Sequence, residues 1–245
     1  MSEWAAKRFW KEATVVEQDD LFGVALDGRP LKTPAKSELR LPTRAMAERV
    51  ADEWQCSDEV INPNVMPWTR SANSAVDKIV SQRADVEAHL AGYCETDMLF
   101  YRADGPAALV TRQADVWDPL VMWATDAFGV TFNVTTGVMP VEQPGETIAQ
   151  LSSVMAPMSP FELTGFHDLV TLSGSYLIGL AVVAERDSLE ALWEASRLDE
   201  AFQIEEWGED EEAREQATLR QLAFFHAADF YRSAKKTGSN NGLRA

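Results

Sequence analysis

Residues 42–54 read PTRAMAERVADEW, and this stretch marks the point at which the chain changes from one kind of secondary structure to another. Met46, Val50 and Trp54 recur every four residues, which places them on one face of a helix, and Thr43 is a suitable N-cap. The sequence before this stretch has the pattern of strands, and most of the sequence after it has the pattern of helices. The stretch therefore predicts an α+β fold in which a small β-rich part comes first.

Upstream of this helix, two segments have the composition of strands. Residues 9–18, FWKEATVVEQ, and residues 21–28, LFGVALDG, are rich in Val, Phe and Leu and are separated by acidic residues. Asp27-Gly28 predicts a hairpin, because glycine tolerates the positive φ that a tight turn requires. Pro34 and Pro42 keep the segment around them extended, because proline cannot continue a helix.

Downstream, the prolines within residues 62–67 interrupt the chain and indicate a domain boundary. We predict a β-rich N-terminal domain with one helix over residues 1–68 and a larger multihelical domain over residues 69–245. Two helical faces stand out there: Ala72, Ala75, Val76, Ile79 and Val80; and Val116, Leu120, Trp123 and Ala124. Further helices are predicted over residues 147–155, 161–184, 189–207 and 210–234.

Charge and composition exclude several classes of protein. The chain of 245 residues carries a net charge of −17; its first fifty residues sum to +1 and the remainder to −18. Such an acidic surface argues against nucleic-acid binding, which needs cations for the phosphate backbone. The longest apolar run, residues 175–184, is about half of a bilayer span and predicts a buried helix without membrane insertion. Two scattered cysteines, Cys56 and Cys94, fit a reducing compartment.

The sequence lacks the usual signatures of an enzyme. It contains no GxxxxGK[ST], GxSxG or HExxH motif. His89, His167 and His226 lie far apart in or near apolar helical sequence, where a single histidine is more often a packing residue than a base. We therefore predict no catalytic residue, no metal ligand and no cofactor.

The most unusual local sequence is EEWGEDEEA, residues 205–213, in which six carboxylates surround a Trp-Gly pair. Gly208 is placed to end one helix, and Asp210, Glu211 and Glu212 to fall in the first turn of the next, where carboxylates complement the helix dipole. Glu205 and Glu206 lie at the opposite, unfavourable end of a helix. They indicate either pairing with an arginine such as Arg197 or a surface kept acidic for a partner.

Three functional interpretations of this run stay open at the level of its residues. The first interpretation is that the carboxylates are oxygen ligands for a metal ion, although the DxDxDG order of a calcium loop is absent. A pair of catalytic carboxylates is another, and it would need a cleft. The third is a partner-binding surface, with a tryptophan at a helix corner among acidic residues.

Ten segments in a fixed order make the chain resemble a known family, the assembly chaperones of the ATP synthase α subunit. The matching segments are FWKEATV (9–15), LDGRPLKTPAK (26–36), LPT (41–43), DEW (52–54), MPWTRSAN (66–73), ETDMLFYRA (95–103), LVTRQADVWDPL (109–120), GVMPV (137–141), LSGSYLIGLAV (172–182) and RLDEAFQIEEWGEDEEA (197–213). The resemblance extends from about residue 8 to residue 231. It implies a β-rich domain followed by a helical one, in agreement with the pattern described above.

The resemblance also implies a function without catalysis. Such proteins bind the unassembled α subunit of the ATP synthase catalytic head and shield its β-facing interface until the β subunit takes over. The family's Trp-Gly-x-x-Glu pattern falls on Trp207, Gly208 and Glu211, so Glu211 is the implied partner-binding residue. Asp210 and Glu212, its neighbours, could share that role.

Other matching residues are interpreted structurally. Trp54, Trp117 and Trp123 are expected in the core because tryptophan buries a large area. Four charged residues are candidates for ion pairs between helices: Arg70, Asp97, Arg102 and Asp118. Gly174 and Ser175 are expected to allow two helices to approach closely.

The resemblance further implies where the protein works and in what state. The chain begins a few residues before FWKEATV, as bacterial members do, so we expect a bacterial cytoplasmic protein, or a mitochondrial matrix protein if it is a processed eukaryotic member. We expect a monomer when it is free. Two rival hypotheses are a metal-dependent hydrolase that uses the acidic cluster around Trp207, and a general acidic holdase without a dedicated client.

Overall fold

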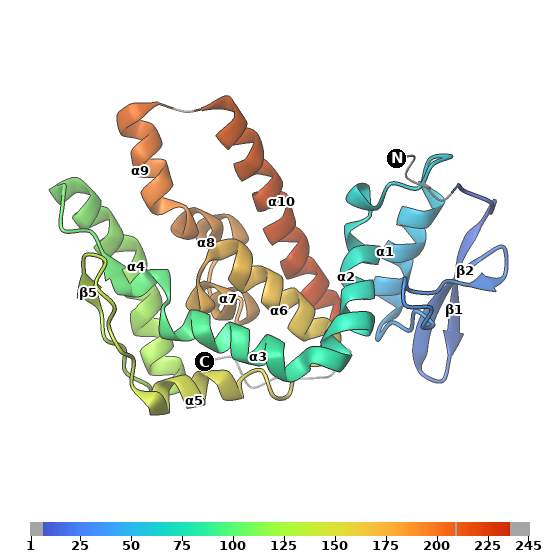
Figure 1. Cartoon of the computed structure of the whole chain (residues 1–245), viewed down its shortest axis with the longest axis horizontal. Coiled ribbons are helices and arrows are strands. Elements are labelled where there is room, and N and C mark those ends of the chain that lie inside the picture. The colour runs from blue at the N-terminus through green and yellow to red at the C-terminus, as the bar shows by residue number, and fades with distance from the viewer. Residues whose placement is uncertain (1–6, 209, 236–245) are drawn as a thin grey trace. The chain divides into compact units, whose positions relative to one another are not determined.

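The computed structural model describes residues 7–208 and 210–235, and the chain divides into two compact units (Figure 1). Unit 1 comprises residues 7–83, 159–165 and 229–235, and unit 2 comprises residues 84–158 and 166–228. The predicted fold class is confirmed, because a small antiparallel sheet at the N-terminal end is followed by a predominantly helical region. The division that we predict after residue 68 remains a prediction.

Unit 1 contains a three-stranded antiparallel sheet in the order β1 (Ala13–Gln18), β2 (Leu21–Leu26) and β3 (Arg29–Pro30). The predicted hairpin at Asp27-Gly28 is confirmed, with φ angles of 48° and 78°. The carboxylate of Asp27 accepts hydrogen bonds from the backbone of Lys11 and Glu12 at 3.0 and 2.9 Å. These bonds lower the pKa of Asp27. The β1–β2 hairpin uses Asp19 and Asp20, also at positive φ, 51° and 60°.

The first helix covers the sheet as its sequence predicts. Helix α1 (Arg44–Gln55) begins at Thr43, whose hydroxyl accepts a hydrogen bond from the backbone N–H of Met46 at 3.3 Å. Met46 and Val50 are fully buried, and Trp54 is half-buried against the same core. That core combines residues from distant parts of the chain: Trp10, Val24, Leu26, Leu31, Leu39, Leu41, Met46, Ala47, Val50, Ala51, Ala72, Phe230 and Ala234.

The remaining helical elements of unit 1 include a turn that is wider than an α-helix. In chain order, the first of them are the 3₁₀ helix η1 (Pro63–Val65), α2 (Pro67–Ser74), the π-helical η2 (Ala75–Ile79) and the start of α3 (Val80–Glu95). Ala72, Ala75 and Ile79 are buried as predicted, but Val80 is 64% exposed. The π turn explains this error, because one extra residue per turn rotates the following residues away from the face on which a regular α-helix would place them.

Unit 2 contains most of the helices and one short parallel strand pair. Its elements, in chain order from α3, are η3 (Met98–Phe100), β4 (Tyr101–Arg102), α4 (Ala107–Phe128), β5 (Thr135–Thr136), α5 (Gly145–Ser153), α6 (Pro160–Ser173), α7 (Tyr176–Val183), α8 (Leu189–Ser196), α9 (Leu198–Trp207) and α10 (Glu211–Ala234). Helices α3, α6 and α10 each have residues in both units. Strand β4 pairs with β5.

Helix α7 is buried along its whole length and lies in the core of unit 2. We predict one helix over residues 161–184, but the chain breaks between α6 and α7, where Gly174 has a φ of 72°. The close approach predicted at Gly174 and Ser175 instead occurs at Gly179, where a Cβ atom would lie 2.7 Å from the Val170 side chain. In the part of the chain described, none of the helices combines the length and the apolar character that a membrane span requires.

The start of α7 is fixed by a buried carboxylate. Asp97 accepts hydrogen bonds from the Ser175 hydroxyl at 2.9 Å and from the backbone N–H groups of Leu177 at 2.9 Å and Leu99 at 3.0 Å. Burial raises the pKa of Asp97 to about 6, although these hydrogen bonds act in the opposite direction. The predicted role of Asp97 in an ion pair is therefore wrong: its partners are a hydroxyl and backbone amides.

Candidate functional site

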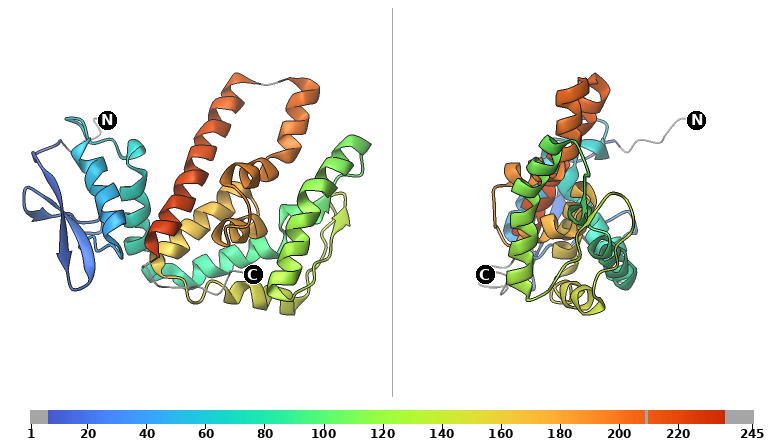
Figure 2. Two further views of the ribbon diagram at one scale, coloured as in Figure 1. Left: turned by 180° about the vertical axis from the view of Figure 1, so that it is seen from behind. Right: turned by 90° about the vertical axis from the view of Figure 1, so that its left-hand side faces the viewer.

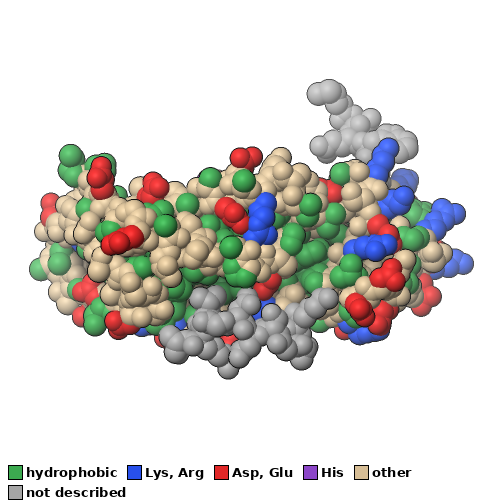
Figure 3. Space-filling model, turned by 90° about the horizontal axis from the view of Figure 1, so that it is seen from below, with side chains coloured by type: hydrophobic (Ala, Val, Ile, Leu, Met, Phe, Trp, Pro, Cys, Tyr) green, Lys and Arg blue, Asp and Glu red, His purple; other side chains and the backbone are tan. Residues whose placement is uncertain are grey.

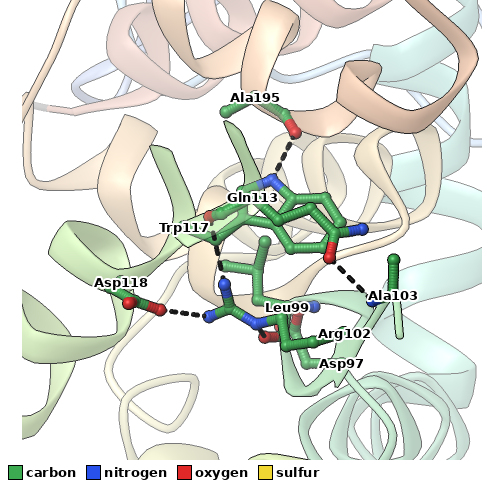
Figure 4. Close-up of polar contacts among 8 residues, drawn as sticks. All are labelled: Asp97, Leu99, Arg102, Ala103, Gln113, Trp117, Asp118 and Ala195. Atoms are coloured by element: carbon green, nitrogen blue, oxygen red, sulfur yellow. Dashed lines mark hydrogen bonds and ion pairs between the residues drawn. The ribbon is translucent and has the colours of Figure 1, made fainter. Parts of the chain in front are cut away.

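A buried arginine organises the base of the site in unit 2 (Figure 4). Arg102 donates hydrogen bonds to the backbone oxygens of Leu99 at 2.9 Å and Gln113 at 3.0 Å, and it forms an ion pair with Asp118 at 2.9 Å. Both residues are among the four that the sequence marks as candidates for ion pairs, although it does not indicate which of them pair. The arginine thus connects the segment around β4 to helix α4.

Helix α4 in turn holds α8 and the start of α9. The side chain of Gln113 donates a hydrogen bond to Asp199 of α9 at 2.7 Å. The indole N–H of Trp117 donates to the backbone oxygen of Ala195 at 2.8 Å (Figure 4). Trp117 is 1% exposed, as predicted for the core, whereas Val116 reaches the surface although we predict it on the buried face. The base of α9 is therefore anchored by buried and half-buried polar contacts.

A surface ion pair extends this attachment along α9. Both guanidinium nitrogens of Arg112 lie 2.8 Å from the carboxylate oxygens of Glu205, and the Arg112 guanidinium also stacks 5.5 Å from the Phe202 ring. The hydrogen bond from Arg112 lowers the pKa of Glu205. Pairing of Glu205 with an arginine is therefore confirmed, but the partner is Arg112. Arg197, the example that we name, pairs instead with Glu200 within the first turn of α9, at 2.8 Å.

Beyond this ion pair, α9 and α10 form a hairpin with little support from the rest of the fold. The chain runs outward along α9, turns after Gly208 and returns along α10 (Figures 1 and 2). Each described residue from 203 to 216 is exposed, on every face of both helices. We call residues 203–208 and 210–216 the hairpin tip. A helix that is exposed all round contributes no face to a core, so the side chains of the tip are available to a partner.

The turn within the hairpin tip has a local cause in its sequence. Gly208 adopts φ 88° and ψ 165°, a region that only glycine occupies readily, and its N–H donates to the backbone oxygen of Ile204 at 2.9 Å. Asp210 then caps α10, because its carboxylate accepts a hydrogen bond from the N–H of Ala213 at 2.9 Å. We predict Asp210 in the first turn, but it precedes the helix. Glu209 lies outside the described residues.

The predicted partner-binding residues lie together on this tip. Trp207 is 80% exposed, and the carboxylates of Glu211 and Glu212 lie in the first turn of α10. Toward the other described residues, Glu211 makes a single ion pair, which is long and exposed, with Arg214 at 3.6 Å. Within the described chain, Glu206 and Glu212 form no ion pair. The structure thus brings Trp207, Gly208, Asp210, Glu211 and Glu212 together at one turn.

The site also includes exposed apolar side chains on α9 and α10, and the sequence pattern did not single these residues out. Ile204 is 41% exposed on α9, and Leu219 and Leu222 are 59% and 61% exposed on α10. Leu219 and Leu222 are three residues apart, so they lie on the same side of their helix. The first half of α10, residues 211–222, otherwise carries only charged, polar and alanine residues, and two leucines in such a segment are a signal that the sequence offers. Ile204 and Trp207 thus give the tip exposed apolar surface beside its carboxylates, and Leu219 and Leu222 extend that surface along α10 beyond the tip.

The metal-site alternative receives no support from this geometry. Among the described residues, which exclude Glu209, no three His, Cys, Asp or Glu side chains are grouped closely enough to hold a metal ion. The exposed carboxylates of the tip also lack the enclosed surroundings that separate the pKa values of a catalytic pair. What the arrangement offers chemically is a negatively charged surface with an exposed indole ring.

Comparison with known proteins identifies the family. The family model for the ATP12 chaperone protein matches residues 7–125. The crystal structure of Atp12 from Paracoccus denitrificans is 46% identical in sequence, covers 95% of this chain and 100% of its own, and superposes with a TM-score of 0.90; a point mutant of the same protein gives the same score and identity. The mitochondrial protein atp12 of Schizosaccharomyces pombe is 23% identical over 85% of this chain and 76% of its own length. The chain belongs to the ATP12 family of chaperone proteins.

Proposed function

We propose that this protein binds the unassembled α subunit of the ATP synthase catalytic head and shields the interface that later faces the β subunit. Membership of the ATP12 chaperone family supports the coarser part of this function, a chaperone of ATP synthase assembly and not an enzyme. The α subunit as client and the shielding of its interface are our proposal. We expect this work to take place in a bacterial cytoplasm, or in the mitochondrial matrix for a eukaryotic member.

The observation that carries the proposal is the exposure of the hairpin tip. Its residues are not needed to bury a core, yet they include an indole ring that is 80% exposed. Tryptophan is enriched among the residues that dominate binding energy at protein interfaces. A tryptophan on a protruding turn is therefore best explained by contact with a partner.

The negative charge of the tip indicates that the client surface in contact with it is basic. Glu206, Asp210, Glu211, Glu212 and Glu215 are exposed on one turn and the helices beside it. Complementary charges accelerate encounter and fix orientation more than they add affinity. Burial of Trp207 and its apolar neighbours would provide most of the binding free energy, at roughly 25 cal/mol per Å² of apolar surface.

The experiment that tests this function is capture of the α and β subunits from the same organism on immobilised protein. We expect wild type to retain α and not β. Glu211→Lys should lose α, because it places a cation against a basic client surface, whereas Glu211→Gln should lose less. The matched control is Glu190→Lys. Glu190 is an exposed glutamate in the first turn of α8, so this variant makes the same change of charge outside the tip.

The outcomes separate the tip from the function as a whole. Retention of neither subunit by wild type contradicts the proposed client. Equal retention of α by wild type and Glu211→Lys contradicts the role of the tip. Equal protection of unrelated unfolded proteins from aggregation would identify a general holdase instead of a dedicated chaperone. Unchanged melting temperatures of both lysine variants show that the loss is one of binding.

A further inference from the structure

Unit 1 contains a pocket that neither the fold nor the proposed function of the hairpin tip uses. It has a volume of about 620 Å³ and lies between the segment after β3, the C-terminal end of α1 and one face of α2. This volume falls within the range of roughly 300–1,000 Å³ that is typical of ligand pockets. The pocket therefore has room for a few amino-acid side chains.

The walls of the pocket are apolar. Trp54, Ile61 and Met66 line it, together with the rings of Pro34 and Pro63. The indole N–H of Trp54 is already engaged, because it donates a hydrogen bond to the Thr69 hydroxyl at 3.1 Å. What Trp54 offers to the pocket is consequently its apolar ring.

A buried network fixes these walls in place. The hydroxyl of Thr69 donates to the carboxylate of Glu53 at 2.7 Å, and the same carboxylate accepts the backbone N–H groups of Trp68 and Thr69 at 2.7 and 2.8 Å. Glu53 thereby caps the start of α2 and holds α1 against it. Because these contacts do not depend on a ligand, the pocket is formed in advance of binding.

Two polar side chains of the lining have hydrogen-bonding capacity to spare. Asn73 and Ser74 are half-buried in α2, and neither side chain hydrogen-bonds to another residue of the described chain. An amide both donates and accepts, as a peptide backbone does. By contrast, the carboxylate of Asp77 is occupied by the Thr33 hydroxyl at 2.7 Å and the N–H of Ala35 at 3.2 Å.

The edge of the pocket is positively charged in a protein whose net charge is −17. Lys32, Arg70 and Lys78 line it and are exposed, and within the described residues none of the three forms an ion pair. With Asp77 as the only carboxylate of the lining, the pocket carries a charge of +2. Lys and Arg side chains also gather over unit 1 on the face that Figure 3 shows.

We infer that this pocket binds a segment of a partner polypeptide in which large apolar side chains adjoin carboxylates. The apolar residues would occupy the space beside Trp54 and Met66, the carboxylates would meet the three cations, and Asn73 would hydrogen-bond to the backbone. The chemistry is opposite in sign to that of the hairpin tip. Assigning the segment to the α subunit rests on the proposed function. If the segment belongs to that subunit, the chaperone holds its client through two oppositely charged sites.

The first test uses labelled peptides and does not require the client. The probe is a fluorescein-labelled octapeptide with phenylalanine and leucine between aspartates, titrated by fluorescence anisotropy into the full-length protein. The controls replace the aspartates by asparagine, or the two apolar residues by alanine. We expect either replacement to weaken binding about tenfold, because one removes the charge pairs with the three cations and the other removes the apolar side chains that would fill the space beside Trp54.

Variants of the protein locate the binding site. Lys32→Glu/Lys78→Glu should weaken the aspartate peptide about tenfold or more, whereas Lys11→Glu/Lys36→Glu, the same change at exposed lysines outside the lining, should not. Arg70→Gln is a second, milder variant that keeps the packing of α2. No binding by the aspartate peptide, or equal binding by both double variants, overturns the inference. Binding of phenylpropionate but not of the peptide overturns the assignment to a polypeptide.

Capture of the α subunit then distinguishes this inference from the proposed function. Weaker capture by Lys32→Glu/Lys78→Glu than by Lys11→Glu/Lys36→Glu supports the α subunit as the source of the segment. Strong and equal capture by both variants overturns that source and leaves the function of the hairpin tip intact. If wild type captures no α subunit, the proposed function fails, and the peptide titration alone decides on the pocket.

Discussion

At the scale of single residues, two tryptophans of unit 2 have opposite environments. Trp117 is 1% exposed and donates a hydrogen bond across the core, whereas Trp207 is 80% exposed at the hairpin tip. Truncation of a buried tryptophan costs about 3–5 kcal/mol, but truncation of an exposed one rarely changes stability by more than about 0.5 kcal/mol. We therefore expect Trp117→Ala to destabilise strongly and Trp207→Ala to lose the client without destabilisation, as urea denaturation and α-subunit capture would measure. A destabilised Trp207→Ala would contradict this division.

The buried Asp97 makes the stability of the fold depend on pH. Burial raises its pKa from 3.8 to about 6, so the folded state holds this proton more tightly than the unfolded state does. The resulting stabilisation is complete below about pH 4 and is lost as pH rises through about 6. The loss is on the order of 3 kcal/mol, since each pKa unit corresponds to about 1.4 kcal/mol.

Comparison with Asp97→Asn isolates this effect from all other titrating groups. Asparagine does not titrate, so the stability of wild type relative to the variant should fall as pH rises from 4 to 7, as urea denaturation at each pH would measure. The variant itself should be less stable, because its NH₂ group would face backbone donors. A difference between the two proteins that stays constant over this range would show that Asp97 does not titrate there.

The turn between β1 and β2 is a second place where one residue should change stability. Asp20 has a φ of 60°, a conformation that costs free energy for residues with a Cβ atom and costs little for glycine. We expect Asp20→Gly to raise the free energy of unfolding by about 0.5–1 kcal/mol. The control is Glu12→Gly at ordinary φ, which should destabilise; a destabilised Asp20→Gly would contradict the strain argument.

At the scale of elements, the attachment of α9 to α4 through Arg112 and Glu205 can be tested separately from the fold. Arg112→Ala should leave global stability nearly unchanged, because the ion pair lies at the surface. It should accelerate hydrogen exchange in the last turn of α9, which loses its contact with α4. The exchanged pair Arg112→Glu/Glu205→Arg should restore protection. Protection that remains unchanged in Arg112→Ala would mean that Phe202 packing alone holds the helix.

The elements that the sequence predicts are those with local causes. Thr43 caps α1, and the four-residue spacing of Met46 and Val50 gives its buried face, so the helix follows from neighbouring residues. The break between α6 and α7 was missed because both helices are apolar and Gly174 alone does not indicate a positive φ. The π turn at η2 was missed because residues 75–79 read as ordinary helix.

The candidate site, too, has features that follow from local sequence and features that depend on distant residues. Trp207, Gly208 and Glu211 follow from a short run of sequence, and the turn there is closed by Gly208 and Asp210 through contacts within six residues. The bond between Arg112 and Glu205 joins residues 93 positions apart, and no local pattern indicates it. The pocket of unit 1 likewise brings residues 32–34, after β3, together with residue 54 of α1 and with lining residues between 61 and 78, and these parts of the chain meet only in the folded structure.

At the scale of the whole molecule, the net charge of −17 should govern how fast a basic client is captured. Long-range attraction between opposite charges raises association rates and is screened by salt, with a Debye length of about 10 Å at 0.1 M. We expect the association rate with the α subunit to fall about tenfold or more between 20 and 300 mM NaCl, and the dissociation rate to change much less. Stopped-flow fluorescence measures both rates.

The control for this prediction is a variant in which Glu206 and Glu212 are both changed to glutamine. Because neither carboxylate forms an ion pair among the described residues, the fold should be unaffected, and the salt dependence of association should become shallower. A rate that does not depend on salt in wild type would mean that encounter is not steered by charge.

The exposure of the hairpin tip also has an evolutionary consequence. Most substitutions in proteins lower stability, and selection removes those that take it below the threshold needed for function, a constraint that is strongest in a packed core. Residues 203–208 and 210–216 are exposed on every face, so under the proposed function changes there are tested by the client and hardly at all by the fold. The tip can therefore adapt to a changing client surface in single mutational steps, while the rest of the chain continues to fold as before.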